Sequence, residues 1–402
     1  FARLEPELLA FMPEPSRFER LQSEARQLGF DQLDPDRRPA LFGLLFGVKD
    51  VFRADGFETS GGSRLPPAEL AGPEAEVVRR LKQLGALVAG KTVSTEFAYF
   101  APGPTHNPHA HGHTPGGSSS GSAAAVGAGL CPLALGTQTI GSISRPAAFC
   151  GVVGYKPTYG TVSARGLIPL SPSLDHVGWF TPDVALSAAV ATAVRRPLGP
   201  APVGERRRPV LAVPVGPFLD RASATGRRHL DEIRQLLAGR GYEVLELEAL
   251  TDIDAIEERH RMIVAAEAAA VHEEWYARHG ELYEHRTREL IERGREVSAG
   301  DLGGALIGRA RLRRELTTLM DSDRVDLWLS PAARGPAPAG LDSTGDPIMN
   351  LPWTHAGLPT LALPAGRDDD GLPLGIQLAA RWDRDEMLFA WGRGIEEALA
   401  DE

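Results

Sequence analysis

Residues 114–160 constrain the fold more than any other stretch, because two serine clusters flanked by glycine lie there inside apolar sequence. The clusters occupy residues 116–122 and 136–142, and residues 123–135 between them are small and apolar. Glycine tolerates positive φ and close backbone approach, and a serine hydroxyl both donates and accepts hydrogen bonds. Such a loop can direct its amides at a carbonyl that the hydroxyl attacks. A flexible linker has a similar composition but usually lies between polar flanks, so both interpretations stay open here.

Strands and helices alternate along the rest of the chain. Short apolar runs predict strands at residues 41–48, 86–92, 210–215, 242–247, 325–329, 360–364 and 374–378. Helical spacing of apolar residues predicts helices at residues 4–28 (divided by two prolines), 74–84, 183–194, 222–238, 253–279, 282–295, 304–320 and 385–398. Residues 160–177 and 348–359 are interpreted as loops, and residues 197–209 as a linker rich in Pro, Gly and Arg. Alternation of this kind favours an α/β sheet.

Charge and cysteine content exclude several classes of protein. The 402 residues carry 43 Lys and Arg against 53 Asp and Glu, and this net charge of −10 argues against a surface for nucleic acid or anionic membranes. The two cysteines, Cys131 and Cys150, make neither a disulfide framework nor a CxxC zinc motif. The longest apolar run, residues 123–135, is too short to cross a bilayer, and nothing near Phe1 resembles a signal peptide. We expect a soluble protein of the reducing cytoplasm.

Lys49 stands directly after an apolar run that predicts a buried strand, and Asp50 follows it. Lysine is rarely buried unless it is paired or used in chemistry. Lys49 could reach the surface along its aliphatic stem, or it could pair with Asp50. Alternatively, burial disfavours its ammonium form, lowers its pKa and leaves an amine that can act as a base. The residue pattern leaves these interpretations open.

Two further patterns carry less information. Residues 85–92 match the phosphate-loop pattern GxxxxGK[ST], but that motif needs a strand before the loop and a helix after it, and here the helix comes first. Four histidines crowd one loop: His106, His109, His111 and His113. The last three would share one face of an extended chain, as metal ligands do. Because no Asp, Glu or Cys in the loop completes a ligand set, solvated histidines are the simpler interpretation.

Taken together, the motifs resemble those of the amidase signature family of serine hydrolases. The matching segments are residues 47–50, 115–125, 136–146, 149–158, 356–364 and 371–378. Residues 195–345 lack a recognisable signature, as expected for the part that varies most in the family. The resemblance implies an α/β fold: a single large domain with a mixed, mostly central sheet of about ten or more strands, covered by helices on both faces. It also implies that no metal or organic cofactor takes part.

The resemblance further implies a Ser–Ser–Lys triad. Ser142 corresponds to the nucleophile, Ser118 to the bridging serine after a cis peptide bond at Gly117–Ser118, and Lys49 to the base. The corresponding oxyanion hole is made by backbone amides of Thr139, Ile140, Gly141 and Ser142. An isolated serine is a poor nucleophile, and no His/Asp pair lies in these motifs. A neutral Lys49 can take a proton from Ser118 while Ser118 takes one from Ser142.

Three positions depart from the family pattern, which commonly has Asp, Gly and Arg where this chain has Gln138, Ile140 and Ser144. The β-branched Ile140 restricts the backbone in the oxyanion loop. The arginine lies one place later, at Arg145, as in the subgroup that contains malonamidase, where the matching arginine binds a substrate carboxylate. A guanidinium suits a carboxylate, and a structural arginine that holds the loop is the alternative.

The function implied is hydrolysis of the C–N bond of a linear amide through an acyl-enzyme on Ser142, on substrates that include small carboxylate-bearing amides. One alternative is an esterase or aryl-acylamidase with an apolar pocket lined by Phe97, Tyr99, Phe100, Ile168 and Trp353. Another is a component of a larger amidase or amidotransferase assembly, although such components usually keep the Asp/Gly/Arg pattern. The expected partners are a small-molecule amide and water, with no nucleic acid or membrane, and relatives are often homodimers.

Within a single amidase domain, residues 1–402, four parts are expected. They are N-terminal helices at residues 1–40, a signature core at 41–195, a variable substrate-pocket region at 196–346, and C-terminal core strands and a helix at 347–402. Because the variable part is expected to shape the acyl and leaving-group pockets, the sequence does not name the substrate.

Overall fold

A computed structural model of the chain describes residues 1–29, 34–196 and 207–400. Within these residues ten strands form one sheet in the order β2-β1-β3-β5-β4-β9-β10-β8-β6-β7. The strands are β1 Leu45–Lys49, β2 Leu87–Thr92, β3 Leu133–Gln138, β4 Val153–Lys156, β5 His176–Thr181, β6 Leu211–Val215, β7 Val244–Glu248, β8 Leu327–Pro331, β9 Thr360–Arg367 and β10 Pro373–Ala379. Pairing is parallel toward both ends of the sheet and antiparallel from β3 to β8 across its middle. The predicted mixed central sheet is confirmed.

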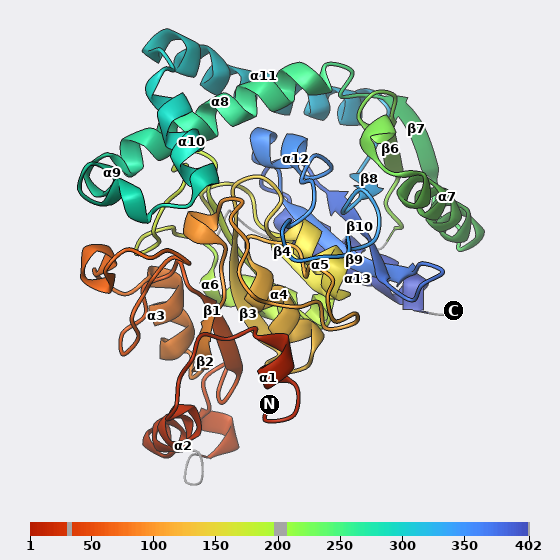
Figure 1. Cartoon of the computed structure of the whole chain (residues 1–402). Helices are drawn as coiled ribbons and strands as arrows, with labels where there is room; N and C mark the ends of the chain where they lie inside the picture. Colours follow the sequence, from red (N-terminus) through yellow and green to blue (C-terminus); the bar gives the residue numbers. More distant parts are fainter. Residues whose placement is uncertain (30–33, 197–206, 401–402) are drawn as a thin grey trace.

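Helices cover the sheet and extend beyond it at one end of the molecule (Figure 1). They are α1 Glu5–Leu8, α2 Arg17–Gln27, α3 Glu76–Gln83, α4 Ser120–Gly127, α5 Ser144–Cys150, α6 Val184–Val194, α7 Ala224–Gly239, α8 Ile253–Val271, α9 Glu273–His279, α10 His285–Arg295, α11 Ala299–Ser322, α12 Leu351–Ala356 and α13 Asp385–Ala400. Helices α8 to α11 gather on the side of the molecule away from α2 (Figure 1). Helix α6 begins as predicted, with the Asp183 side chain accepting a hydrogen bond from the Leu186 amide at 2.7 Å.

The two faces of the sheet bury different kinds of side chain. In β3, Leu133 and Leu135 pack in a cluster with residues of α3, α6, α7 and α13, whereas Ala134 packs in a second cluster with the alanines of α4 and α5. Successive side chains of a strand point to opposite faces. One face is therefore covered through large aliphatic residues, and the other carries α4 and α5 on small ones.

Helix α5 lies unusually close to the sheet because glycines face it. A Cβ on Gly154 of β4 would come 2.6 Å from Cβ of Ala147, and one on Gly375 of β10 would come 2.9 Å from Cβ of Ala148. Both distances are shorter than carbon atoms tolerate, so neither position can carry even a methyl group without displacing the helix. The small residues of the stretch 114–160 thus serve close packing, and the linker interpretation of this stretch is wrong.

The sequence patterns did not predict several elements of the structure. Strand β5 begins inside the stretch 160–177, which had been expected to be loop, and α12 occupies part of the expected loop 348–359. The short helix α5 has Pro146 in its first turn, where proline is tolerated, and it ends at Gly151 with φ 63°. Most of the predicted linker, residues 197–206, lies outside the described residues. No helix in the described ranges is long and apolar enough to cross a membrane.

Candidate active site

The predicted site residues gather where β1 and β3 end and β5 begins. Lys49 is the last residue of β1, and β1 is parallel to its neighbour β3. The loop that contains Ser142 follows the end of β3 at Gln138, which is paired with His176 at the start of the antiparallel β5. Ser118 lies just before α4. Carboxyl ends of parallel strands commonly carry the ligand site in open α/β sheets.

Lys49 contacts two hydroxyls within the core. Its Nζ lies 2.7 Å from Oγ of Ser118 and 2.7 Å from Oγ1 of Thr137. Lys49 is fully buried, Ser118 is 1 % exposed, and the Gly117–Ser118 peptide bond is cis, as the resemblance implied. Ser142 makes no hydrogen bond to either residue within the described chain and is 7 % exposed, on the pocket side of its loop. The structure therefore brings Lys49 and Ser118 into direct contact and places Ser142 on the pocket wall.

Burial lowers the pKa of Lys49 well below its ordinary value, and the carboxylate of Asp175 opposes this shift in part. Asp50 does not pair with Lys49. It instead forms a buried ion pair with Lys91, whose Nζ lies 2.8 Å from Oδ1 of Asp50. Within the described residues Lys49 thus contacts two hydroxyls and forms no ion pair, and its burial favours the neutral amine.

The departure at Gln138 has a structural role. Its Oε1 accepts hydrogen bonds from the backbone amides of Ile143 at 2.7 Å and Ser144 at 2.9 Å, at the start of α5. Its Nε2 donates to Oγ1 of Thr354 in α12 at 2.9 Å. An amide side chain supplies both a donor and an acceptor, so glutamine fixes this end of the loop from two sides.

The three backbone amides that precede Ile143 lack such partners. Within the described residues, the N–H groups of Ile140, Gly141 and Ser142 make no hydrogen bond inside the chain. Buried amides are rarely left unpaired, so three consecutive free donors beside a pocket are notable. They are the type of group that an oxyanion hole presents.

The side chain of Thr139 is held by a buried carboxyl group. Its hydroxyl donates to Oδ1 of Asp175 at 2.6 Å, and Oδ2 of Asp175 accepts from the amides of Leu170 and Ser171. Burial nevertheless raises the pKa of Asp175 to about 6. Asp175 lies in the stretch 160–177, which was interpreted as a loop, and its carboxylate ties this stretch to the loop that begins at Thr139.

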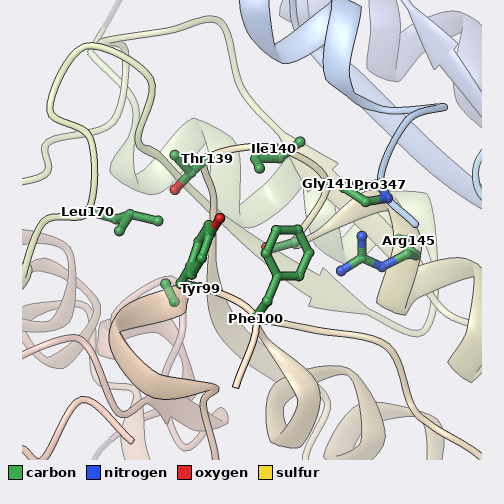
Figure 2. A pocket seen from close by; sticks show the side chains of 10 residues that line it. Tyr99, Phe100, Thr139, Ile140, Gly141, Arg145, Leu170 and Pro347 are labelled. Atoms are coloured by element: carbon green, nitrogen blue, oxygen red, sulfur yellow. The ribbon is translucent and has the colours of Figure 1, made fainter. Parts of the chain in front are cut away.

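A small pocket of about 10 Å³ opens beside Ser142. Its wall combines the loop at 139–142 with the rings of Tyr99 and Phe100, and Figure 2 shows these rings across the pocket from Thr139 and Ile140. The remaining lining residues are Ala98, Arg145, Leu170 and Pro347. Of the apolar residues expected to line a pocket, Phe97, Ile168 and Trp353 instead lie in buried clusters of the core. That part of the expectation is wrong.

Arg145 is the charged residue of the pocket wall. It is 1 % exposed, and its Nη2 donates to the carbonyl of Gly117 at 2.7 Å and to Oγ1 of Thr344 at 3.1 Å. Its Nε and Nη1 are buried without a hydrogen-bond partner in the described chain. Burial lowers the pKa of Arg145 to about 10, so the guanidinium remains charged at neutral pH. One guanidinium nitrogen of Arg145 thus holds the Gly117 carbonyl and the Thr344 hydroxyl, and the other two nitrogens have no partner among the described residues.

Three of the four histidines in the loop at residues 106–113 make contacts with nearby groups of the chain. His106 and His111 stack with ring centroids 3.8 Å apart, and Nε2 of His109 lies 2.9 Å from the carbonyl of Cys150. Across the described ranges, no group of three or more His, Cys, Asp or Glu side chains is arranged to hold a metal ion.

Comparison with known proteins decides the family. The sequence pattern of the family described as Amidase matches residues 16–389. The chain belongs to the amidase signature family. A glutamyl-tRNA(Gln) amidotransferase subunit from Thermus thermophilus is 36 % identical over 99 % of this chain and 91 % of its own length. A crystal structure of an amidase superimposes with a TM-score of 0.88 at 31 % identity, covering 99 % of this chain and 94 % of the other. The peptide amidase of Stenotrophomonas maltophilia gives a TM-score of 0.80 at 26 % identity, covering 99 % and 90 %.

Sequence reasoning missed several residues of this amidase-family site. Thr137 contacts Lys49 from within β3, and His260 of α8 contacts the carbonyl of Thr139 with its Nε2 at 3.0 Å. Alternation along β3 could have shown that Thr137 shares a face with Leu135, but not that Lys49 reaches it. His260 lies in the part of the chain without recognisable motifs, so only the packing of α8 reveals its place.

Proposed function

We propose that this amidase-family enzyme cleaves the C–N bond of a carboxamide through an acyl-enzyme on Ser142, with Ser118 as proton relay and Lys49 as base. One observation carries the proposal: a buried lysine, with its ammonium form disfavoured, lies 2.7 Å from a buried serine hydroxyl. A neutral amine that donates an N–H to Thr137 keeps its lone pair for Ser118. A base within hydrogen-bond reach is what a serine nucleophile requires.

In this mechanism protons move from Ser142 through Ser118 to Lys49 and back along the same path. Oγ of Ser142 attacks the carbonyl carbon, its proton passes to Ser118, and the proton of Ser118 passes to Lys49, which becomes an ammonium. The tetrahedral oxyanion is stabilised by the free amides of Ile140 and Gly141. As the C–N bond breaks, the same relay returns a proton to the leaving nitrogen. Water then attacks the acyl carbonyl along the reverse path and releases the acid.

The location of Arg145 supports an acyl group that carries its own carboxylate. Two of its guanidinium nitrogens are buried without a partner and it lines the same pocket as Ser142. A carboxylate that reached this guanidinium would satisfy donors that otherwise lack a partner, by charge-assisted hydrogen bonds. We propose small amides with a carboxylate near the scissile carbonyl as the preferred substrates, as in the malonamidase-like subgroup.

A second candidate is favoured by the names of the relatives. Several relatives that are 31–36 % identical to this chain are subunits of glutamyl-tRNA(Gln) amidotransferase. In that setting the same acylation of Ser142 would supply nitrogen to an acceptor held by partner subunits. The net charge of −10 implies that any RNA would be held mainly by those partners. The relatives support this setting, whereas the departures at Gln138, Ile140 and Ser144 argue for a free-standing hydrolase.

Assays of the purified chain without partner proteins test both the triad and the choice between the two candidate functions. Ammonia release from a panel of amides is expected without partners, and Ser142→Ala and Lys49→Ala are each expected to lower kcat by at least about 10³. Matched controls are Ser144→Ala and Lys156→Met, which change a buried serine and a buried lysine away from the Lys49–Ser118 contact. A covalent serine probe should label Ser142, as shown by intact mass and peptide mapping.

Near-full activity in Ser142→Ala or Lys49→Ala would overturn the triad. Activity that appears only after an amidotransferase partner is added, and still depends on Ser142, would select the second candidate.

A further inference from the structure

Two fully buried histidines lie behind the oxyanion loop, on elements outside the signature core. His260 comes from α8 and His355 from α12, and both are 0 % exposed. Nε2 of His260 lies 3.0 Å from the carbonyl oxygen of Thr139, and its Nδ1 lies 3.3 Å from Nδ1 of His355. A buried histidine that only fills the core needs no such contact with the loop that carries Ser142.

The contact with Thr139 fixes the direction of an amide. In a trans peptide the C=O and the following N–H point in opposite directions across one plane. Since the Thr139 carbonyl points at His260, the N–H of Ile140 points away from α8, and this N–H has no partner in the described chain. The next plane is held likewise, because Oγ1 of Thr354 donates to the Ile140 carbonyl at 2.7 Å.

We propose that His260, oriented by His355, is a positioning residue that holds the Thr139–Ile140 peptide plane in the orientation that stabilises the oxyanion. The inference rests on the proposed acyl-enzyme chemistry at Ser142. His260 would touch neither substrate nor reacting atoms and would act only through the peptide whose carbonyl it holds.

The protonation of the pair is consistent with this role. Burial, together with the charge of Arg309, lowers the pKa of His260 to about 3, and burial together with His260 and Arg309 lowers that of His355 to about 2. Both rings are therefore neutral at working pH. To donate to the Thr139 carbonyl, His260 must carry its proton on Nε2, and its Nδ1 then accepts from Nδ1–H of His355. This leaves Nε2 of His355 as an acceptor, and it has no partner within the described residues.

The framework around the pair keeps it in place. Nε of Arg309 in α11 donates to the carbonyl of His355 at 3.1 Å, so α11 and α12 are joined directly beside the histidines. Preorganised donors lower a barrier because they need not rotate into place as charge develops. A peptide plane held from behind by a rigid ring meets that requirement better than a free loop would.

The test compares a substitution that keeps the donor with one that removes it. In His260→Gln the side-chain amide can still donate to the Thr139 carbonyl, whereas His260→Met fills similar space without a donor. We expect kcat to fall about 10- to 100-fold in His260→Met and to stay within about fivefold in His260→Gln, with KM within about threefold in both. Loss of one whole oxyanion donor costs about 10²–10³ in kcat, and misorientation should cost less.

Two further readouts separate positioning from folding. A boronic acid that mimics the tetrahedral adduct should bind His260→Met about 10- to 100-fold more weakly, while the carboxylic acid product binds equally well. Thermal unfolding of both variants provides the stability control. If His260→Met fails to fold, His355→Met replaces it in the test. This variant leaves His260 in place but removes the N–H donor that keeps the His260 proton on Nε2, and we expect it to lower kcat about 3- to 10-fold.

Equal kcat in His260→Met and wild type, or equal losses in the Met and Gln variants, would overturn the positioning role. In the fallback case, wild-type kcat in His355→Met would do the same. None of these outcomes alters the proposed function, which fails instead if Ser142→Ala remains active.

Discussion

Replacing Arg145 by methionine is expected to separate substrate preference from stability. Burial lowers the pKa of Arg145 from 12.5 to about 10, and it still donates two hydrogen bonds, to Gly117 and Thr344. A shift of this size corresponds to about 3 kcal/mol against the charged, buried guanidinium. Hydrogen bonds from a charged group each contribute about 1.5–3 kcal/mol. The two hydrogen bonds together contribute about 3–6 kcal/mol, and the burial cost of about 3 kcal/mol opposes them, so Arg145→Met should lower the free energy of unfolding by no more than about 3 kcal/mol.

Arg145→Met should also change which substrates the enzyme prefers. A carboxylate that reaches the two unpartnered nitrogens of Arg145 would gain charge-assisted hydrogen bonds worth about 1.5–3 kcal/mol. That range corresponds to roughly 10- to 150-fold in kcat/KM. We therefore expect Arg145→Met to lower kcat/KM by this factor for an acid-bearing amide and to leave a neutral amide of equal size nearly unchanged. Arg145→Lys, which keeps a charge but loses the planar fork, should recover only part of the loss.

The assay measures ammonia release from a matched pair, such as the monoamide of a short dicarboxylic acid and the corresponding neutral amide, and reports the ratio of their kcat/KM values. Urea unfolding of the same preparations gives the change in stability. If the ratio is the same in wild type and Arg145→Met, the carboxylate role is refuted, and Arg145 is a structural residue that holds Gly117.

Two further predictions concern ionisable groups in the core. Burial lowers the pKa of Lys49, and the carboxylate of Asp175 raises it. Asp175→Asn should therefore lower the pKa of Lys49 further and shift the acid limb of the kcat/KM profile to lower pH. An acid limb that stays in place or moves to higher pH would contradict a neutral Lys49 as base. Burial also lowers the pKa of Lys156 from 10.5 to about 7. Between pH 7 and pH 10.5 the unfolded state therefore binds more protons than the folded state. Burial of Lys156 lowers the free energy of unfolding by about 5 kcal/mol below pH 7, and this loss becomes smaller as the pH rises. Relative to Lys156→Met, the wild type should therefore gain about 2 kcal/mol of unfolding free energy between pH 7.5 and 9 in urea titrations, and parallel stability curves would refute this.

The sequence predicted those parts of the site that depend on local pattern. Lys49 was recognisable because a lysine at the end of an apolar run is unusual, and the family resemblance paired it with Ser118. The partner of Asp50 was not predictable, since Lys91 is distant in sequence and only the parallel pairing of β1 with β2 brings it near. A strand pattern shows which face a residue is on, but not which of several neighbours it will contact.

The elements that were missed were short or contained residues that usually end helices. Helices α5 and α12 have seven and six residues, and each contains a proline in its first turn. Tertiary contacts, rather than propensity, hold such short helices. His260 was missed for another reason: α8 has an ordinary helical pattern, and no local signal distinguishes a histidine that faces the core from one that faces a loop of the site.

The glycines that face α5 have a consequence for how this enzyme could change. Because Gly154 and Gly375 leave no room for a methyl group beneath the helix, these two glycines set the spacing between the sheet and the middle of α5. Random mutation can only add atoms there, and every addition would push the loop that carries Ser142 outward. New specificities should therefore arise by exchange of Tyr99, Phe100 or Leu170 on the opposite wall, where one side chain can replace another while the reacting groups keep their places.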